Sequence, residues 1–195
     1  MTKAFVLGNG VSRQVVGLDS LNLLGPTYGC NALYRDFTPD VLVATDRPIA
    51  THIQESGYPL TNKFYTRRPL AGLGAKSVPH DYFGYSSGPI ALSIACLDGY
   101  TQIYMIGFDM GPTLDNQFNN LYSGTEFYKP STAIPTFTGN WVKQMCHIMS
   151  DFPTVQFYRV AGATTAKISE FNRVNNMVHV DMNTFLTRIN TTKDL

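Results

Sequence analysis

The chain has 195 residues, of which 44% are hydrophobic and 15% are charged, and its formal net charge is +1. These values fit one globular domain with a single core and exclude a disordered tail. No basic cluster extends beyond Arg67-Arg68 and no apolar run reaches the length of a membrane-spanning helix, which disfavours nucleic-acid binding and a membrane span.

Apolar segments alternate with helix-like segments through the first part of the chain. Strands are predicted at 3–7, 26–30, 41–45 and 63–66. A short helix is expected from about Ser12, which can cap it. A second helix is expected to end near Glu55, and Asp46 is expected to cap it. For Asp46 the cap role is favoured over binding a metal or ribose or acting as a base.

The alternation continues to the end of the sequence. Helices are predicted at about 88–98, 138–150 and 181–189, with strands at 102–106 and 155–160. This pattern predicts an α/β fold: a single Rossmann-like domain over 1–195, with a doubly wound, mainly parallel sheet and helices on both faces.

Two long segments interrupt this rhythm, at 69–85 and 111–137. Connections of this length in a compact domain are usually binding loops or lids. Both are therefore expected to cover the carboxyl ends of the strands, where such sheets bind ligands.

A glycine turn, Gly8-Asn9-Gly10, follows the first predicted strand. It is not the dinucleotide fingerprint, because Arg13 occupies the place of the third glycine. The small residues leave room for a ligand beside Asn9. An ordinary tight turn explains the glycines equally well.

Two further segments suggest a binding site for an anionic ligand such as a nucleotide phosphate. Asn31 follows the second strand, and its amide suits ribose hydroxyls or a base edge, although a turn role is the alternative. Ser86-Ser87-Gly88-Pro89 precedes a helix with almost no polar face, so its free N–H groups are expected to open into a central crevice. The predicted nucleotide-binding residues are Gly8, Asn9, Gly10, Ser12, Asn31, Ser86, Ser87 and Gly88.

Few residues are suited to catalysis. Asp109 ends an apolar strand and no predicted helix follows for it to cap, which favours a ligand role. His80 is the one histidine in a long loop. Because no Asp-x-Asp pair is present, a required metal is not expected. Tyr122 and Tyr128 are among the loop aromatics that could hydrogen-bond a phosphate.

Several of these segments together resemble bacterial sialyltransferases of glycosyltransferase family 42. The order and spacing match from the glycine turn to Asp109 and, more faintly, to Val160, through Gly8-Asn9-Gly10-Val11-Ser12, Cys30-Asn31-Ala32-Leu33-Tyr34, Ser86-Ser87-Gly88 and Gly107-Phe108-Asp109. The resemblance implies a cytidine monophosphate (CMP) sugar as donor, no cofactor and no catalytic metal. It also implies nucleotide contacts by Asn9, Asn31, Ser87 and Gly88, with Asp109 close by.

The chain departs from this family at its catalytic residues. The family's histidine base is missing from the stretch 136–140. Gly84 stands near the place of a family arginine, and Gly111 and Gln117 stand where two tyrosines are expected. If the chain is active, His80 or Asp109 would take the acceptor proton, and Tyr122 or Tyr128 would hold the departing phosphate.

Three functions therefore remain open. The first is a glycosyltransferase that uses a CMP-sugar, and the second is an inactive relative that binds a nucleotide or a partner protein. The third is a magnesium-dependent enzyme similar to the archaeal 6-hydroxymethylpterin pyrophosphokinases, which would need Asp46, Asp109 and Asp115.

The remaining expectations concern the environment of the protein. Three cysteines without a Cys-x-x-Cys pair predict reduced thiols. With no secretory leader recognised, the expected location is the cytoplasm, or the host cytoplasm if a phage encodes the chain. The apolar tail at 177–189 could support a homo-oligomer.

Overall fold

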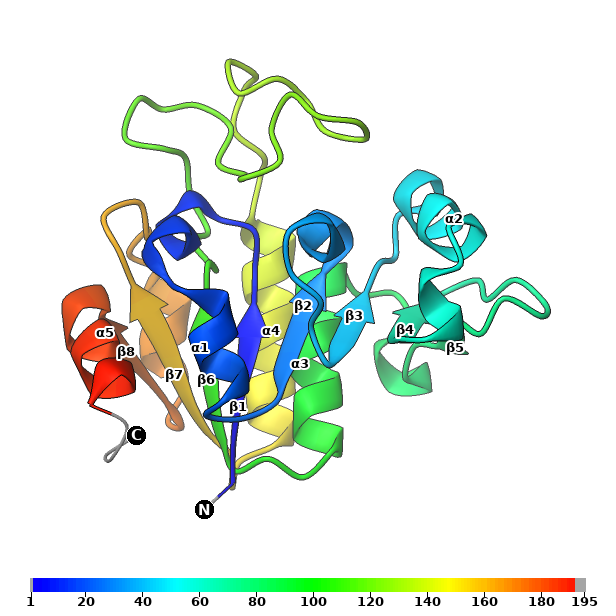
Figure 1. Ribbon diagram of the computed structural model, residues 1–195. Coiled ribbons are helices and arrows are strands. Elements are labelled where there is room, and N and C mark those ends of the chain that lie inside the picture. The colour runs from blue at the N-terminus through cyan, green and yellow to red at the C-terminus, as the bar shows by residue number, and fades with distance from the viewer. Residues whose placement is uncertain (1, 192–195) are drawn as a thin grey trace.

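The computed structural model describes residues 2–191 and contains one sheet of eight parallel strands, in the order β5-β4-β3-β2-β1-β6-β7-β8 (Figure 1). The predicted α/β fold is confirmed, and the sheet is parallel throughout. The strands are β1 (Lys3–Leu7), β2 (Thr27–Cys30), β3 (Val41–Val43), β4 (Lys63–Thr66), β5 (Lys76–Ser77), β6 (Gln102–Ile106), β7 (Gln156–Ala161) and β8 (Met177–Asp181).

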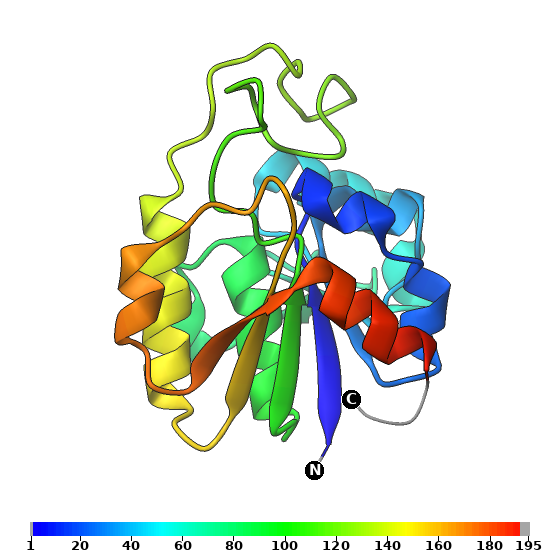
Figure 2. The same ribbon diagram turned by 90° about the vertical axis from the view of Figure 1, so that its left-hand side faces the viewer.

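Helices cover both faces of the sheet, as Figures 1 and 2 show. One face carries α3 (Ser87–Leu97) and α4 (Gly139–Asp151), and the other carries α1 (Leu18–Asn22), α2 (Arg47–Glu55) and α5 (Met182–Asn190). Successive residues of a strand point to opposite faces, so β1 contributes to both cores. Ala4 and Val6 pack with α3 and α4, whereas Phe5 and Leu7 pack on the other side.

Helix α3 is buried nearly all round, because it lies between the sheet and α4. Pro89 stands in its first turn, where the missing N–H costs no hydrogen bond. Gly99, with φ of +90°, follows its carboxyl end and turns the chain toward β6. The helix therefore begins at the carboxyl edge of the sheet, as its sequence predicts.

Several short elements were not predicted. Strand β5 and a short 3₁₀ helix at His80–Tyr82 lie within the segment 69–85, for which the sequence predicts a loop. Strand β8 was missed because its residues alternate poorly: as an edge strand it exposes Val178 and His179. Edge strands need less apolar surface than central ones, so their pattern is weaker.

The chain order defines a switch point in the middle of the sheet. From β1 the chain proceeds outward to β5 and then returns to β6 on the opposite side of β1. Ligands of open α/β sheets bind where the strand order reverses in this way. The long segment 111–137 rises above this edge of the sheet (Figures 1 and 2).

The ends of β1 and β6 approach each other too closely for side chains. A Cβ atom at Gly8 would lie 2.5 Å from the carbonyl oxygen of Gly107, and one at Gly107 would lie 2.6 Å from that of Gly8. Gly107 also has a φ of +75°, which disfavours other residues. The glycines thus serve the packing of the two strands.

No helix described within residues 2–191 combines the length and the apolar character needed to cross a membrane.

We expect Gly8→Ala to lower the free energy of unfolding by about 1–3 kcal/mol, because the added methyl meets backbone that cannot move aside. Urea denaturation measures this. The control is Gly84→Ala, whose added Cβ meets nothing within 4 Å. Equal stability of the two variants would contradict the close approach of β1 and β6.

Candidate functional site

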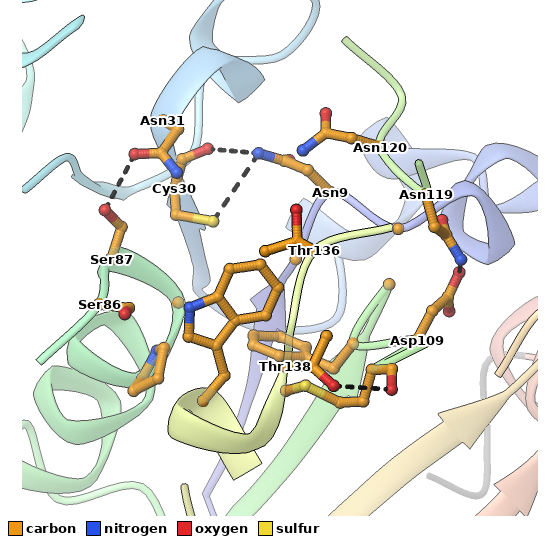
Figure 3. A pocket seen from close by; sticks show the side chains of 18 of the residues that line it. Asn9, Cys30, Asn31, Ser86, Ser87, Asp109, Asn119, Asn120, Thr136 and Thr138 are labelled. Atoms are coloured by element: carbon orange, nitrogen blue, oxygen red, sulfur yellow. Dashed lines mark hydrogen bonds between the residues drawn. The ribbon is translucent and has the colours of Figure 1, made fainter. Parts of the chain in front are cut away.

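A cavity of about 300 Å³ opens at the carboxyl ends of β1, β2, β3 and β6, beside the start of α3 (Figure 3). The segment 111–137 and the start of α4 supply further wall residues. The structure brings together all the predicted nucleotide-binding residues except Ser12: Gly8, Asn9, Gly10, Asn31, Ser86, Ser87 and Gly88.

The amides after the glycine turn already have partners. Gly10 donates its N–H to the carbonyl of Gly107, and Val11 donates to Oδ1 of Asn119 at 2.8 Å. The amide of Ser12 donates to the Asp109 carboxylate at 3.1 Å. Asp109 is thus the acceptor for the Ser12 amide, and the amides of Gly10, Val11 and Ser12 are not free to bind an anionic ligand.

Ser12 does not cap the helix that it was expected to begin. The 3₁₀ helix at Val11–Val15 has Gly10 at its N-cap, and Ser12 lies inside it. The Ser12 hydroxyl instead donates to the Asp109 carboxylate. The expected cap is therefore wrong, because a buried carboxylate provides a stronger acceptor for this hydroxyl.

Asp109 is only 3% exposed and joins three parts of the chain. Its carboxylate accepts five hydrogen bonds, two from Ser12 and one each from Asn119, Thr164 and Thr165. The donors come from the β1 turn, the segment 111–137 and the connection between β7 and β8. Such a saturated carboxylate is suited to holding the site in shape.

Arg159 of β7 stabilises the turn that contains Phe108 and Asp109. It is 1% exposed, and its guanidinium donates to the carbonyls of Phe108, Asp109 and Ala166 at 2.8–3.0 Å. Burial lowers the pKa of Arg159 to about 10, against an opposing effect of the Asp109 charge. The group is therefore still a cation at neutral pH, and it fixes the turn that follows β6.

The start of α3 keeps free donors. Ser86 donates its N–H to Oε1 of Gln144 at 2.9 Å, but no acceptor among residues 2–191 engages the amides of Ser87 and Gly88. These amides lie at the positive end of an 11-residue helix, where an anion is favoured. Of the two helix starts predicted to receive an anion, this one has amides available.

A hydrogen-bond network positions the polar side chains at the ends of β1, β2 and β3 (Figure 3). Asn9 donates to the carbonyl of Cys30 at 3.0 Å, and Asn31 accepts from the Ser87 hydroxyl at 2.9 Å. Thr45 donates its amide to the same hydroxyl at 3.0 Å. Asn31 has a φ of +53°, a conformation that asparagine tolerates better than most residues.

One atom of this network lacks a partner. Oδ1 of Asn9 is buried without a hydrogen bond to any residue in the range 2–191, and the residue is 8% exposed. An unsatisfied buried acceptor costs about 1–3 kcal/mol. A ligand N–H or O–H group would remove that cost, so Asn9 is poised to accept from a bound molecule.

Asp46 differs from its expected role. It occupies the N-cap position of α2, but its side chain makes no capping hydrogen bond, so that prediction is wrong. The carboxylate lines the cavity and has no partner within the part of the chain that the structure describes. The helix start is held by backbone alone, which leaves Asp46 available as a base.

Other wall residues were not predicted from the sequence. They include Trp141, Thr136, Thr138, Asn119, Asn120 and Arg67. Trp141 is the single tryptophan of the chain and stands in the first turn of α4. Its being the single tryptophan is the one feature of the sequence that could have drawn attention to it, because no local pattern predicts that α4 begins at the cavity.

Three predicted catalytic residues lie outside the cavity lining. His80 is fully exposed beside Asp81. The Tyr122 hydroxyl accepts from Arg13 at 3.3 Å, and burial raises its pKa to about 12. The Tyr128 hydroxyl accepts from the amide of Ala32 at 3.3 Å. The catalytic roles of His80, Tyr122 and Tyr128 stay predictions.

Within residues 2–191, no group of three or more His, Cys, Asp or Glu side chains is arranged to hold a metal ion. Of the carboxylates that a magnesium-dependent enzyme would need, Asp46 and Asp109 line the cavity, whereas Asp115 is exposed on the long loop. The oxygens of Asp109 are already occupied by donors.

The chain matches no protein-family model and no curated protein sequence. It is similar in structure to the sialyltransferase CstII from Campylobacter jejuni, solved in complex with a substrate analogue, cytidine-5'-monophosphate. The TM-score is 0.53 with 14% sequence identity, over 94% of this chain and 88% of that one. The two proteins share a fold. At this identity the likeness extends no further than the architecture.

We expect Asp109→Asn to lower the free energy of unfolding by about 1–3 kcal/mol, because an NH₂ group replaces one of the two oxygens that accept hydrogen bonds from buried donors and leaves those donors without a partner. Chemical denaturation measures the change. Asp115→Asn, at an exposed position of the segment 111–137, is the matched control and should differ from the parent by no more than about 0.5 kcal/mol. Similar stabilities for both variants would rule out a structural role for Asp109.

Proposed function

We propose that the cavity binds the nucleotide of a CMP-sugar and that the protein is a metal-independent glycosyltransferase of the sialyltransferase type. The observation that carries the proposal is the pair of free amides at Ser87 and Gly88, which face the same cavity as Asn9 and Asn31. This cavity lies at the switch point of a sheet whose fold is shared with a CMP-bound sialyltransferase.

The nucleotide phosphate would bind at the start of α3. Two unpaired amides and the positive end of the helix dipole favour an oxyanion at this position. Arg67 is the cation among the described residues of the lining, and its guanidinium is held by the carbonyls of Phe83, Gly84 and Tyr85. These donors would stabilise the charge that develops on the departing phosphate without a metal.

The nucleoside would bind toward the ends of β1 and β2. The unpaired Oδ1 of Asn9 accepts from an amino group or a ribose hydroxyl, and the amide of Asn31 offers a further donor. The indole of Trp141, in the cavity wall, provides an aromatic surface for a base or a sugar ring.

The acceptor proton would pass to Asp46. In the proposed reaction an acceptor hydroxyl attacks the anomeric carbon of the donor, the bond from that carbon to the phosphate oxygen breaks, and CMP leaves with the bonding electrons. Asp46 takes the proton of the attacking hydroxyl. A base in this position typically contributes about 10²–10⁴-fold to the rate.

A second candidate is a protein of the same fold that binds the nucleotide without turnover. The occupied oxygens of Asp109 favour it, as does the position of His80 outside the lining. With Asp109 and His80 excluded as bases, an active enzyme would depend on Asp46 alone. Binding of the nucleotide without turnover would show that Asp46 does not act as a base.

The fluorescence of Trp141 gives the Kd for CMP. In a separate denaturation experiment, we expect CMP at 100 times this Kd to raise the free energy of unfolding by about 2.7 kcal/mol. Asn31→Ala should weaken CMP binding about tenfold through the loss of one hydrogen bond of about 1.4 kcal/mol. Asn183→Ala, exposed on α5, is the control. CMP affinity that is absent, or equal in both variants, would contradict the proposed site.

Catalysis is tested by the release of CMP from CMP-N-acetylneuraminate. We expect Asp46→Asn to lower kcat about 10²–10⁴-fold with little change in CMP affinity, because the base acts only in the chemical step. Asp19→Asn, exposed on α1, is the control. A loss confined to His80→Ala would instead support the base predicted from the sequence, and binding without any release would support the inactive candidate.

A further inference from the structure

A second cavity of about 190 Å³ adjoins the first and shares Thr45, Asp46 and Arg67 with it. It lies between α2 and the carboxyl end of β4. Its wall also includes Arg47, Thr66 and Arg68, and we name it the arginine cavity.

Positive charge dominates the arginine cavity. Arg47, Arg67 and Arg68 face one carboxylate, that of Asp46. Among residues 2–191, none of these guanidinium groups lies within 4.0 Å of a carboxylate. Arg67 is anchored by backbone carbonyls, whereas the side chains of Arg47 and Arg68 make no hydrogen bond with the residues that the structure describes. Three cations against one anion leave a net attraction for negative charge.

The start of α2 adds backbone donors. Because Asp46 makes no capping hydrogen bond, the amides of Arg47 and Ile49 have no acceptor within the described chain, and Pro48 has no N–H. The helix has nine residues, so its positive end also faces this space.

A buried hydroxyl points to a ligand independently of the helix. Thr66 is 1% exposed and lines the cavity, yet its hydroxyl makes no hydrogen bond with the described residues. Its side chain lies on the same side of β4 as that of Phe64, which is the side that α2 covers. Buried hydroxyls normally have a partner, so this one is available to a bound molecule.

The cavity wall is held rigid by Gln54. Its amide nitrogen donates to the carbonyls of Ala50 and Arg68, and its amide oxygen accepts from Leu70 at 2.7 Å. The buried Gln54 thus fastens the segment after β4 to α2. A preorganised set of donors loses little entropy when it binds a ligand.

We propose that the arginine cavity binds an oxyanion group, either a carboxylate or a phosphate. The donors available are guanidinium, hydroxyl and backbone amide groups, which together match such a group. The inference rests on the proposed function for the source of the group. The oxyanion group belongs either to the sugar of the donor or to a second substrate. In the second case Asp46, which lines both cavities, would face a hydroxyl of that substrate.

The test measures binding of inorganic phosphate by calorimetry at constant ionic strength, with and without saturating CMP. We expect phosphate to bind the CMP-saturated protein, and Arg47→Ala/Arg68→Ala to weaken this binding at least tenfold. Arg173→Ala/Arg188→Ala removes the same charge elsewhere and should change it less than twofold. Equal losses in both double variants, or phosphate binding that CMP abolishes, would overturn the proposal.

Two further ligands distinguish the two possible sources of the oxyanion, the donor sugar and a second substrate. If the donor supplies it, Arg47→Ala/Arg68→Ala weakens binding of CMP-N-acetylneuraminate but not of CMP. If a second substrate supplies it, Arg47→Ala/Arg68→Ala changes the affinities for CMP and for CMP-N-acetylneuraminate by less than twofold. Free N-acetylneuraminate or phosphate then binds in addition to the donor. No effect on any of these ligands would refute the site.

Failure of the proposed function is distinguishable from failure of this inference. If CMP does not bind at all, phosphate binding without CMP still compares the two double variants. Their thermal unfolding confirms that both are folded, because the mutated side chains are exposed. A loss of phosphate affinity in Arg47→Ala/Arg68→Ala alone would then support the oxyanion site, whereas equal phosphate affinity in the two double variants would refute it.

Discussion

The carboxyl ends of β1, β6 and β7 depend on two buried charged side chains, Arg159 and Asp109. Arg159 draws the carbonyls of the turn after β6 toward β7, and the Asp109 carboxylate gathers donors from three segments of the chain. Each charge would be costly to bury alone, and each reduces that cost through hydrogen bonds and through attraction to the other. This constraint fixes the floor of the cavity. The Asp109 carboxylate also accepts from the Ser12 amide, whereas the amides of Ser87 and Gly88 have no acceptor among residues 2–191.

The site follows from this division of roles. Asp109 serves the structure, whereas the carboxylate of Asp46, after the end of β3, has no partner in the described part of the chain and lies where the two cavities meet. Within residues 2–191 the amides of Ser87 and Gly88 have no acceptor and form the proposed anion site, and the oxygen of Asn9 has no donor and offers an acceptor nearby. The proposed positions for a nucleotide phosphate and for a second oxyanion, with the Asp46 carboxylate between them, would suit group transfer. In the proposed reaction, helix ends and guanidinium groups would carry the positive charge.

The fold was largely predictable because central parallel strands are continuous apolar runs, and β1, β4 and β6 agree with their predicted bounds. The convergence of Asn9, Asn31 and Ser87 was also predictable, since parallel strands and the helices after them end at one edge. The partners of Asp109 were not, because Asn119, Thr164 and Thr165 reach it from distant loops. For the same reason Asp46 was misjudged: its cap position is local, but the absence of a capping bond depends on the three-dimensional arrangement.

The most direct measurement is the change in backbone amide resonances when CMP is added to the ¹⁵N-labelled protein. Our account predicts the largest shifts at Ser87 and Gly88, where unpaired amides face the cavity. It predicts small shifts at Val11 and Ser12, whose amides already bind Asn119 and Asp109. Largest shifts at Val11 and Ser12, or no shift at the start of α3, would contradict it.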